Sequence, residues 1–249
     1  MINMCLMILL NLLVGGCIGL TGIAGFLLPM FYTGFLGMPS AEALALSFAA
    51  FMISGILGSV NYHKSGNLDL KTAGILSVGS FIGALAGVKI NLLIPEDKMK
   101  VILYLVVLIS GISILLRKDK TEVSGKEKQK RNPVFYLVLG VVTGAVCAAS
   151  GAGGPILVMP ILTLLGIPAH MAVGISLFDS IFIALPAVVG YLHAAAGTEG
   201  MYVLLPVLLI AHGIGVFAGS KNATRINQKM LKQIVAVASI AIACIKLFI

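Results

Sequence analysis

Long apolar stretches separated by short polar ones make up most of the chain. A helix needs about 20 apolar residues to cross a bilayer core of roughly 30 Å, and none of the stretches alternates as barrel strands do. The pattern predicts an all-α, polytopic integral membrane protein with about eight hydrophobic helical segments, forming one membrane domain over residues 1–249. The predicted segments are 4–37, 41–62, 72–92, 100–116, 133–166, 168–192, 201–220 and 233–249.

The stretches 4–37 and 133–166 are longer than one crossing requires. Each has 34 residues, about 50 Å of helix at 1.5 Å per residue. Each also contains a glycine-rich element, TGIAG at 21–25 and SGAGG at 150–154. We therefore expect each stretch to be a steeply tilted, broken helix or a re-entrant hairpin that turns back at mid-membrane. Irregular backbone at that depth is tolerated only where protein or a water-filled cavity satisfies its polar groups.

The two glycine-rich elements belong to an internal repeat with an offset of 129 residues. Each is followed fifteen residues on by Leu-Gly-x-Pro and then by a serine. The repeat predicts two homologous halves, 1–116 and 133–249, joined by a linker at 117–132. Such halves with glycine-broken apolar segments are typical of transporters whose site lies between the repeats. The matched pairs include Gly22 and Gly151, Gly25 and Gly154, Ser47 and Ser176, and Tyr62 and Tyr191.

Small residues recur every fourth position further along each half. Gly79, Gly83 and Gly87 form one such series, and Gly215 and Gly219 form the other, with the repeat offset now 132 residues. This spacing allows helix backbones to approach closely in lipid. We expect a packing role for these glycines and no chemistry.

The positions of the charged residues indicate which segments lie outside the membrane and on which side. With 59% hydrophobic and 10% charged residues, the chain has too few charges to cover a water-soluble domain. Of 17 Lys and Arg residues, seven fall between Arg117 and Arg131. By the positive-inside rule this segment is a cytoplasmic linker of a cell-membrane protein. Nucleic-acid binding is a poor interpretation of it.

The positive-inside rule also helps to decide whether the stretches 4–37 and 133–166 cross the membrane. If all eight segments cross and the N-terminus is inside, ten basic residues lie inside and seven outside. If 4–37 and 133–166 are re-entrant and the N-terminus is outside, the counts become 13 and 4. The second arrangement obeys the rule better and leaves the two halves inverted. Whether each half has an odd or an even number of crossings stays open.

The glycine-rich elements are the best candidates for a binding site. Glycine N–H groups can point into a cavity, and Pro155 suits the first turn of a following helix, whose N-terminus attracts an anion. Thr21 and Ser150 would add hydroxyl donors, and Ser47 and Ser176 either face the cavity or bond to their own helices. The alternative is a kink needed only for packing. The predicted substrate-binding residues are Thr21, Gly22, Gly25, Ser47, Ser150, Gly151, Gly153, Gly154, Pro155 and Ser176.

Two ionisable residues lie within apolar stretches. Asp179 is the only acidic residue deep in such a stretch, and an ionisable group there is a functional hypothesis by default. It carries a coupling proton or holds a cation, or it is a buried carboxyl hydrogen-bonded to Ser176, Ser180 or a neighbouring helix. His212 is a second candidate for proton coupling. The sequence contains no catalytic constellation, nucleotide-binding loop or metal-binding motif, so we expect neither an enzyme nor a cofactor.

These motifs together resemble those of the TauE/SafE family of sulfite and organosulfonate exporters. The resemblance rests on SGAGGPILVMPILTLLGIPAHMAVGIS (150–176), TGIAGFLLPMFYTGFLGMPSAEALALS (21–47) and YHKSGNLDLKTAG (62–74). Ala24 and Phe26 replace the Gly and Pro of the second-half motif. The resemblance implies a secondary transporter in the lipid bilayer that exports a small anion such as sulfite or a sulfonate. A homodimer is compatible with it. A non-transporting membrane scaffold and an anion channel are the alternatives.

Overall fold

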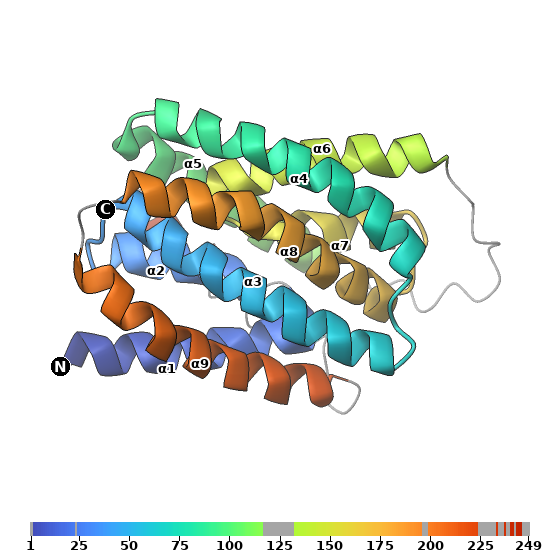
Figure 1. Cartoon of the computed structure of the whole chain (residues 1–249), viewed down its shortest axis with the longest axis horizontal. Helices are drawn as coiled ribbons and strands as arrows, with labels where there is room; N and C mark the ends of the chain where they lie inside the picture. The colour runs from blue at the N-terminus through green and yellow to red at the C-terminus, as the bar shows by residue number, and fades with distance from the viewer. Residues whose placement is uncertain are drawn as a thin grey trace.

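The computed structural model describes residues 2–22, 24–116, 132–195 and 199–223, together with isolated positions beyond residue 232. The described residues form helices and short connections without any strand, so the predicted all-α class is confirmed (Figure 1). Residues 117–131 and more than half of the predicted segment 233–249 lie outside the described residues. The helices are α1 (Ile2–Thr21), η1 (Ala24–Phe26), α2 (Leu27–Gly34), α3 (Ser40–Lys64), α4 (Leu70–Leu93), α5 (Glu96–Leu116), α6 (Pro133–Ser150), α7 (Gly154–Leu164), α8 (Ala169–Ala194) and α9 (Glu199–Lys221).

Six of the described helices are long and apolar enough to cross a membrane. The helix α7 is equally apolar but has only 11 residues. The stretch 133–166 is therefore divided into one helix of membrane-crossing length and one short helix. The stretch 4–37 is divided in the same way into α1, η1 and α2. The six candidates are Met4–Thr21, Ser40–Lys64, Leu70–Leu93, Pro133–Ser150, Ala169–Ala194 and Leu204–Lys221.

Local sequence signals set the helix ends. The Asp69 carboxylate caps α4 by accepting the Lys71 N–H at 3.1 Å and the Thr72 hydroxyl at 2.8 Å. Asn132 caps α6 in the same manner, with Pro133 in the first turn. Gly151 ends α6 in the left-handed conformation, with φ of 73°, which glycine adopts without steric cost.

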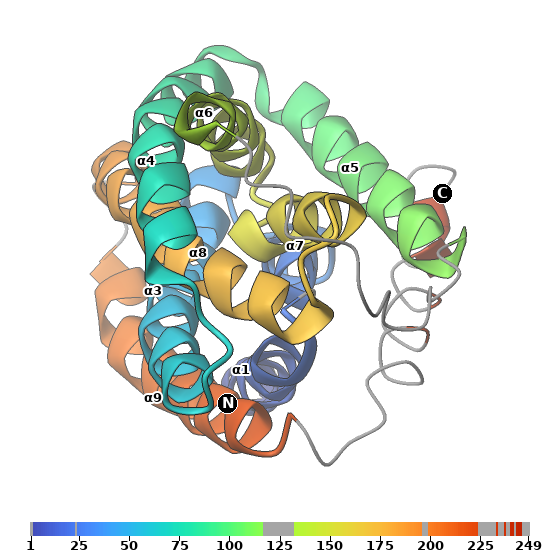
Figure 2. The same ribbon diagram turned by 90° about the vertical axis from the view of Figure 1, so that its right-hand side faces the viewer.

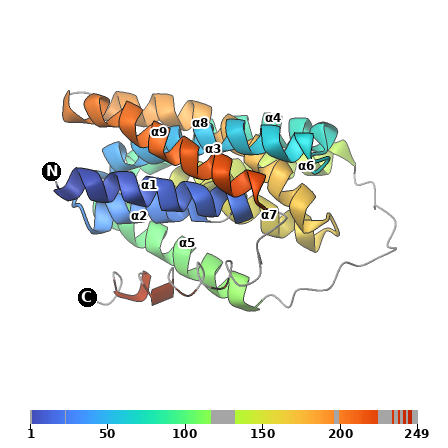
Figure 3. The same ribbon diagram turned by 90° about the horizontal axis from the view of Figure 1, so that it is seen from below.

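Both broken stretches return to the end of the bundle where they began. In Figures 1 and 3, α1 starts at the N-terminal end and α3 also starts there, only five residues after α2. Conversely, α6 and α8 both start at the opposite end, which we call the α3–α4 end because it holds residues 65–69. Because these connections are short, α2 returns toward the end where α1 began, packed mainly on α3, and α7 returns toward the end where α6 began, packed mainly on α8. The buried Asn11 amide of α1 holds α2 by donating to the Tyr32 hydroxyl at 2.6 Å.

The glycine series lock helices of different halves together. A Cβ atom added to Gly83 of α4 would meet the carbonyl oxygen of Val141 in α6, and one added to Gly215 of α9 would meet that of Leu12 in α1. Backbone therefore lies directly on backbone, as the sequence predicts for these glycines. Figure 2, which looks along the bundle, shows the pairs α4–α6 and α1–α9 on either side of the central helices α3 and α8.

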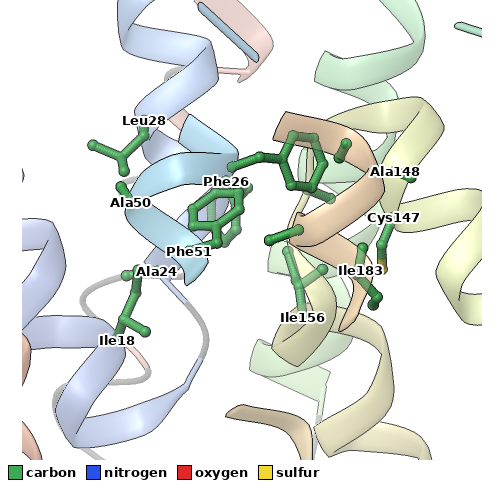
Figure 4. Packing of buried hydrophobic residues seen from close by; sticks show 14 of the residues in the cluster. Ile18, Ala24, Phe26, Leu28, Ala50, Phe51, Cys147, Ala148, Ile156 and Ile183 are labelled. Carbon is green, nitrogen blue, oxygen red and sulfur yellow. The ribbon is translucent and has the colours of Figure 1, made fainter. Parts of the chain in front are cut away.

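Aromatic and branched side chains fill the space around α3 and α8. Phe48 of α3 stacks on Tyr191 of α8, with 5.8 Å between the ring centroids, and packs edge-on against Phe51 at 5.5 Å. Figure 4 shows this region, where residues of the two broken stretches approach each other across Phe51. Buried aromatic and branched side chains therefore surround the two breaks.

We predict that Gly83→Ala destabilises the protein, because the new methyl group must push α4 away from α6. Overpacking of this kind costs about 1–3 kcal/mol. The matched control is Gly74→Ala in the same helix, where a Cβ atom meets nothing within 4 Å and alanine is favoured by about 0.5–1 kcal/mol. Thermal unfolding in detergent should show a lower melting temperature for Gly83→Ala only. Equal melting of both variants would contradict the close packing of α4 on α6.

Candidate functional site

The two glycine bends share one backbone geometry at their first position. Gly22 and Gly151 both have φ of 73°. The Gly22 N–H donates to the Ile18 carbonyl at 2.7 Å, and the Gly151 N–H donates to the Cys147 carbonyl at 3.0 Å. The two helices α1 and α6 thus end in the same left-handed cap, at positions related by the repeat offset.

The two bends diverge after this first position. Gly153 has φ of 78° and ψ of 150°, a conformation that is essentially restricted to glycine, and α7 begins at the next residue with Pro155 in its first turn. In the first half, the corresponding Ala24 begins the short 3₁₀ turn η1, which ends at the buried Phe26. Only the second bend leads directly into an α-helix of more than two turns.

A small cavity of about 10 Å³, roughly the room for one water molecule, lies between the two bends. It is bordered by the end of α1, the bends themselves, the start of α7 and the middle of α3 and α8. Its lining is apolar apart from two serine side chains and the backbone of the bends, and it includes no acidic or basic residue of the described chain. The lining residues are Ile18, Gly22, Gly25, Phe51, Ser54, Ala152, Gly153, Pro155, Ile156 and Ser180.

Phe51 connects the two bends across the cavity. A Cβ atom on Gly25 would lie 2.9 Å from the Phe51 ring, and one on Gly153 would lie 3.2 Å from it. Figure 4 shows the Phe51 side chain between Ala24 and Ile156. Glycine at both positions therefore leaves the room that this ring occupies, so any side chain added to either bend would press on Phe51.

Ser180 is the residue that the 129-residue offset pairs with Phe51. Its hydroxyl lies 3.5 Å from the Phe51 carbonyl and donates to the Leu177 carbonyl at 2.7 Å. A Cβ atom on Gly154 would meet the Cα of Ser180 at 3.3 Å, just as Gly25 meets Phe51. The two halves are thus in contact at equivalent residues of α3 and α8.

The structure brings four of the predicted binding residues to the cavity: Gly22, Gly25, Gly153 and Pro155. It places Gly151 and Gly154 elsewhere, because Gly151 packs on Leu44 and Gly154 packs on α8. The two bends therefore contribute to the lining with two residues each from the predicted set.

The four predicted hydroxyl groups are turned away from the cavity. Thr21 donates to the Cys17 carbonyl at 2.8 Å and Ser150 to the Val146 carbonyl at 2.7 Å, so the hydroxyl donors expected there are already used. Ser47 donates to the Ala43 carbonyl at 2.6 Å and Ser176 to the Val173 carbonyl at 3.0 Å. Of the two possibilities for Ser47 and Ser176, the structure shows bonding to their own helices.

Asp179 is completely buried on the side of α8 that faces α4. The hydroxyls of Ser77 and Ser80 in α4 are its polar neighbours. Among the described residues, however, neither carboxylate oxygen of Asp179 has a hydrogen bond of good geometry, and the Ser77 hydroxyl has none either. A buried carboxyl group with unused oxygen atoms is a costly feature and marks this position as more than packing.

His212 is also completely buried, on the opposite side of the cavity. Its Nε2 atom lies 2.6 Å from the hydroxyl of Ser54, a cavity-lining residue of α3. The offset of 132 residues pairs His212 with Ser80, the neighbour of Asp179. The two ionisable residues predicted from the sequence therefore do not meet, but lie on equivalent flanks of the cavity, one at α4–α8 and the other at α3–α9.

Two tyrosines related by the repeat hold the helices that precede the bends. The Tyr191 hydroxyl donates to the Ala148 carbonyl in the last turn of α6 at 2.8 Å. The Tyr62 hydroxyl lies 3.3 Å from both the Gly19 and the Leu20 carbonyl in the last turn of α1. Carbonyls in the last turn of a helix lack intrahelical partners, so each tyrosine satisfies a backbone group just before the bend.

The sequence-based prediction missed Phe51, Ser54 and Ser180 as lining residues. The repeat would have indicated two of them, because it aligns Phe51 with Ser180 in the middle of equivalent segments. Ser54 has no such signal, because its repeat partner is Ile183. Its position in the cavity follows only from the packing of α3 against α9.

An all-helical, multi-span bundle with two buried glycine bends defines a polytopic membrane protein of the transporter type. Comparison with known proteins makes the assignment specific: the family model for the sulfite exporter TauE/SafE matches residues 6–245. The chain belongs to this family.

Curated relatives cover almost the whole chain. It is 27% identical to the probable membrane transporter protein YdhB of Bacillus subtilis, over 91% of this chain and 93% of the relative. It is 28% identical to a probable membrane transporter protein of Methanocaldococcus jannaschii, over 90% and 86% of the two chains. A probable membrane transporter protein of Haemophilus influenzae is 26% identical, over 88% and 87%. No solved structure matches the chain.

We predict that Ser54→Ala lowers the stability of the protein, because it leaves the buried Nε2 atom of His212 without its partner. An unsatisfied buried polar group costs about 1–3 kcal/mol. Ser59→Ala in the same helix is the control, since the Ser59 hydroxyl donates only to the Ile56 carbonyl of its own helix. Thermal unfolding in detergent compares the two variants. Equal losses for both would show that the Ser54–His212 contact contributes nothing.

Proposed function

We propose that the protein is a secondary transporter that exports a small anion, sulfite or an organosulfonate, and binds it in the cavity between the two glycine bends. One observation carries the proposal. Two backbone bends at repeat-related positions border one buried cavity, and its described lining contains serine hydroxyls and no acidic side chain. An anion that enters as the two bends move apart would therefore meet the polar backbone of the bends without a repelling carboxylate.

The second bend supplies the stronger attraction for an anion. The first N–H groups of α7 have no partners within the helix, and the partial positive charge of a helix N-terminus favours an anion by about 0.3–1 kcal/mol, or more where it is buried. Because Gly153 and Pro155 both line the cavity, the start of α7 is directed toward it. The first bend offers only the short turn η1, so the two halves bind unequally.

The membrane orientation follows from the charges at the two ends of the bundle. Lys64, Lys71 and Lys221 lie at the α3–α4 end, where α6 also begins directly after the basic linker. The positive-inside rule therefore places this end in the cytoplasm. In this orientation α1–α2 and α6–α7 are re-entrant hairpins that enter from opposite sides, as the halves of an inverted repeat do.

The driving force needs no nucleotide. Moving one elementary charge across the membrane is worth about 2.3 kcal/mol per 100 mV, so the export of a monoanion from an inside-negative cell is electrically downhill. Asp179 and His212 are the proposed proton-coupling residues, one on each flank of the cavity. Each can change its charge without contacting the substrate directly.

We predict that Gly153→Ala abolishes transport, because alanine cannot adopt the Gly153 backbone conformation without strain and its methyl group would press on Phe51. The efflux of ³⁵S-labelled sulfite from proteoliposomes should fall at least about tenfold, which corresponds to about 1.4 kcal/mol in the barrier.

Gly166→Ala is the matched control for this substitution. Gly166 also has positive φ, 88°, but a Cβ atom there meets nothing within 4 Å. It lies in the α7–α8 connection, away from the cavity. Both variants place alanine at a positive-φ glycine, and a loss of flux confined to Gly153→Ala, at comparable melting temperatures, is the expected result. Unchanged flux in Gly153→Ala would refute the site.

We predict that Asp179→Asn removes the response of transport to a proton gradient, because asparagine cannot carry the coupling proton. The substrate for this test is methanesulfonate, whose charge is constant across neutral pH. Flux through the unmodified protein should change when a pH gradient is imposed, whereas flux through Asp179→Asn should not. Asp97→Asn, which changes an acid of α5 outside the apolar core, should respond as the unmodified protein does. A full response in Asp179→Asn would exclude Asp179 from coupling.

A further inference from the structure

A second, larger pocket opens at the α3–α4 end of the bundle, with a volume of about 260 Å³. Lys64 and Lys221, both exposed, border it from the ends of α3 and α9, and His170 borders it from the start of α8. Its polar wall includes Asn61 and Ser220, whose side chains are joined by a hydrogen bond of 2.7 Å. None of the described lining residues is acidic. The pocket is therefore a basic, polar recess.

Tyr62 separates this recess from the cavity. The residue borders the recess, and its hydroxyl lies 3.3 Å from the Gly19 and Leu20 carbonyls at the end of α1. Gly22, which follows two residues after Leu20, lines the cavity. The side chain of one tyrosine and the last turn of α1 thus lie between the recess and the proposed binding site.

The corresponding place at the N-terminal end is packed instead of open. The repeat pairs Asn61 with Gly190 and Ser220 with Val88. There a Cβ atom on Gly190 would meet the Cγ1 of Val88 at 2.5 Å, so apolar packing replaces the Asn61–Ser220 hydrogen bond. A polar recess of the kind seen beside Tyr62 cannot form around such a contact.

The hydrogen bond from the tyrosine hydroxyl to the helix before the bend is also shorter at that end. Tyr191 donates to the Ala148 carbonyl at 2.8 Å, and the Asn91 amide donates to the neighbouring Ala149 carbonyl at 2.6 Å. The repeat partner of Asn91 is Ala223, which has no side-chain donor. At the second bend two short side-chain hydrogen bonds reach the last turn of α6, whereas the Tyr62 contacts at the first bend are longer.

We propose that the recess beside Tyr62 is an anion-collecting vestibule, in which Lys64 and Lys221 concentrate a small oxyanion before it passes Tyr62 into the cavity. This inference rests on the proposed transport function and names the side from which the substrate enters. Cationic side chains around a recess with low-dielectric walls raise the local concentration of anions and speed their entry. Within the described residues, the recess lies at the α3–α4 end, and the repeat-related position at the other end is packed by Gly190 and Val88.

The first experiment measures the electrostatic potential of the recess without requiring transport. A single cysteine is introduced as Ser65→Cys in a background in which Cys5, Cys17, Cys147 and Cys244 are replaced by alanine. Ser65 is exposed and borders the recess. Its rate of modification by an anionic and by a cationic methanethiosulfonate reagent is measured in detergent. We expect the anionic reagent to react faster once the rates are normalised to those for a free thiol in solution.

Charge removal then tests which lysines are responsible. Lys64→Gln with Lys221→Gln should lower the anion-to-cation rate ratio about fivefold at low salt, since two charges several ångströms away act through water. The control pair, Lys71→Gln with Lys89→Gln, removes the same charge from exposed lysines outside the recess. Lys89 is also the repeat partner of Lys221. An equal drop in both pairs, or no drop in either, would overturn the vestibule.

The same variants separate the vestibule from the proposed transport function. In proteoliposomes, Lys64→Gln with Lys221→Gln should raise the KM for ³⁵S-labelled sulfite supplied at the α3–α4 end about fivefold, with little change in the maximal rate. The control pair should leave KM unchanged. If the unmodified protein moves no anion, the proposed function falls, whereas the thiol rates still decide the vestibule.

The last experiment tests whether the recess holds a free oxyanion or a lipid headgroup. Added methanesulfonate should slow the modification of Ser65→Cys by the anionic reagent, in detergent and in vesicles of zwitterionic lipid alike. Protection that appears only with anionic lipid, and not with methanesulfonate, would assign the recess to a lipid headgroup and overturn the proposal.

Discussion

Backbone polar groups at two helix breaks, deep in an apolar bundle, are the constraint on which the rest of this structure depends. Each break leaves carbonyls and N–H groups without helical partners, and lipid offers them none. The protein meets the need on the carbonyl side with Tyr62, Tyr191 and Asn91, whose side chains reach the last turns of α1 and α6. Gly153 and Pro155 place the start of α7 against the cavity instead.

The close packing of the glycine series serves the same constraint. Because α4 lies on α6 and α9 lies on α1 with backbone against backbone, each broken stretch is fixed by a helix from the other half. The central helices α3 and α8 then meet at Phe51 and Ser180, between the bends. A bend that was held only by its own half could relax into lipid. Here it could do so only by separating two pairs of interlocked helices.

Much of this architecture is predictable from the sequence, for identifiable reasons. Apolar stretches bounded by prolines and polar connections determine the helices, and positive-φ glycines in TGIAG and SGAGG determine the breaks. The lining residues are less predictable, because an aromatic such as Phe51 in an apolar stretch looks like any other core residue. Hydroxyl groups misled the prediction for a physical reason: near a helix end in apolar surroundings, Thr21 and Ser150 gain most by bonding to the carbonyl four residues earlier. The neighbours of Asp179 come from a distant part of the chain and belong to tertiary structure alone.

The differences between the halves carry as much information as their likeness. In an inverted repeat with identical halves, the states open to either side would have equal free energy, and neither would be preferred. Here the Asn91 amide forms a hydrogen bond at the N-terminal end that Ala223 cannot form at the other end. Apolar packing of Gly190 on Val88 at the N-terminal end likewise replaces the Asn61–Ser220 hydrogen bond of the other end. A single hydrogen bond contributes about 0.5–1.5 kcal/mol, enough to shift a two-state equilibrium severalfold. These differences therefore favour the state that is open toward Lys64 and Lys221, which is the resting state that the proposed export of a cytoplasmic anion requires.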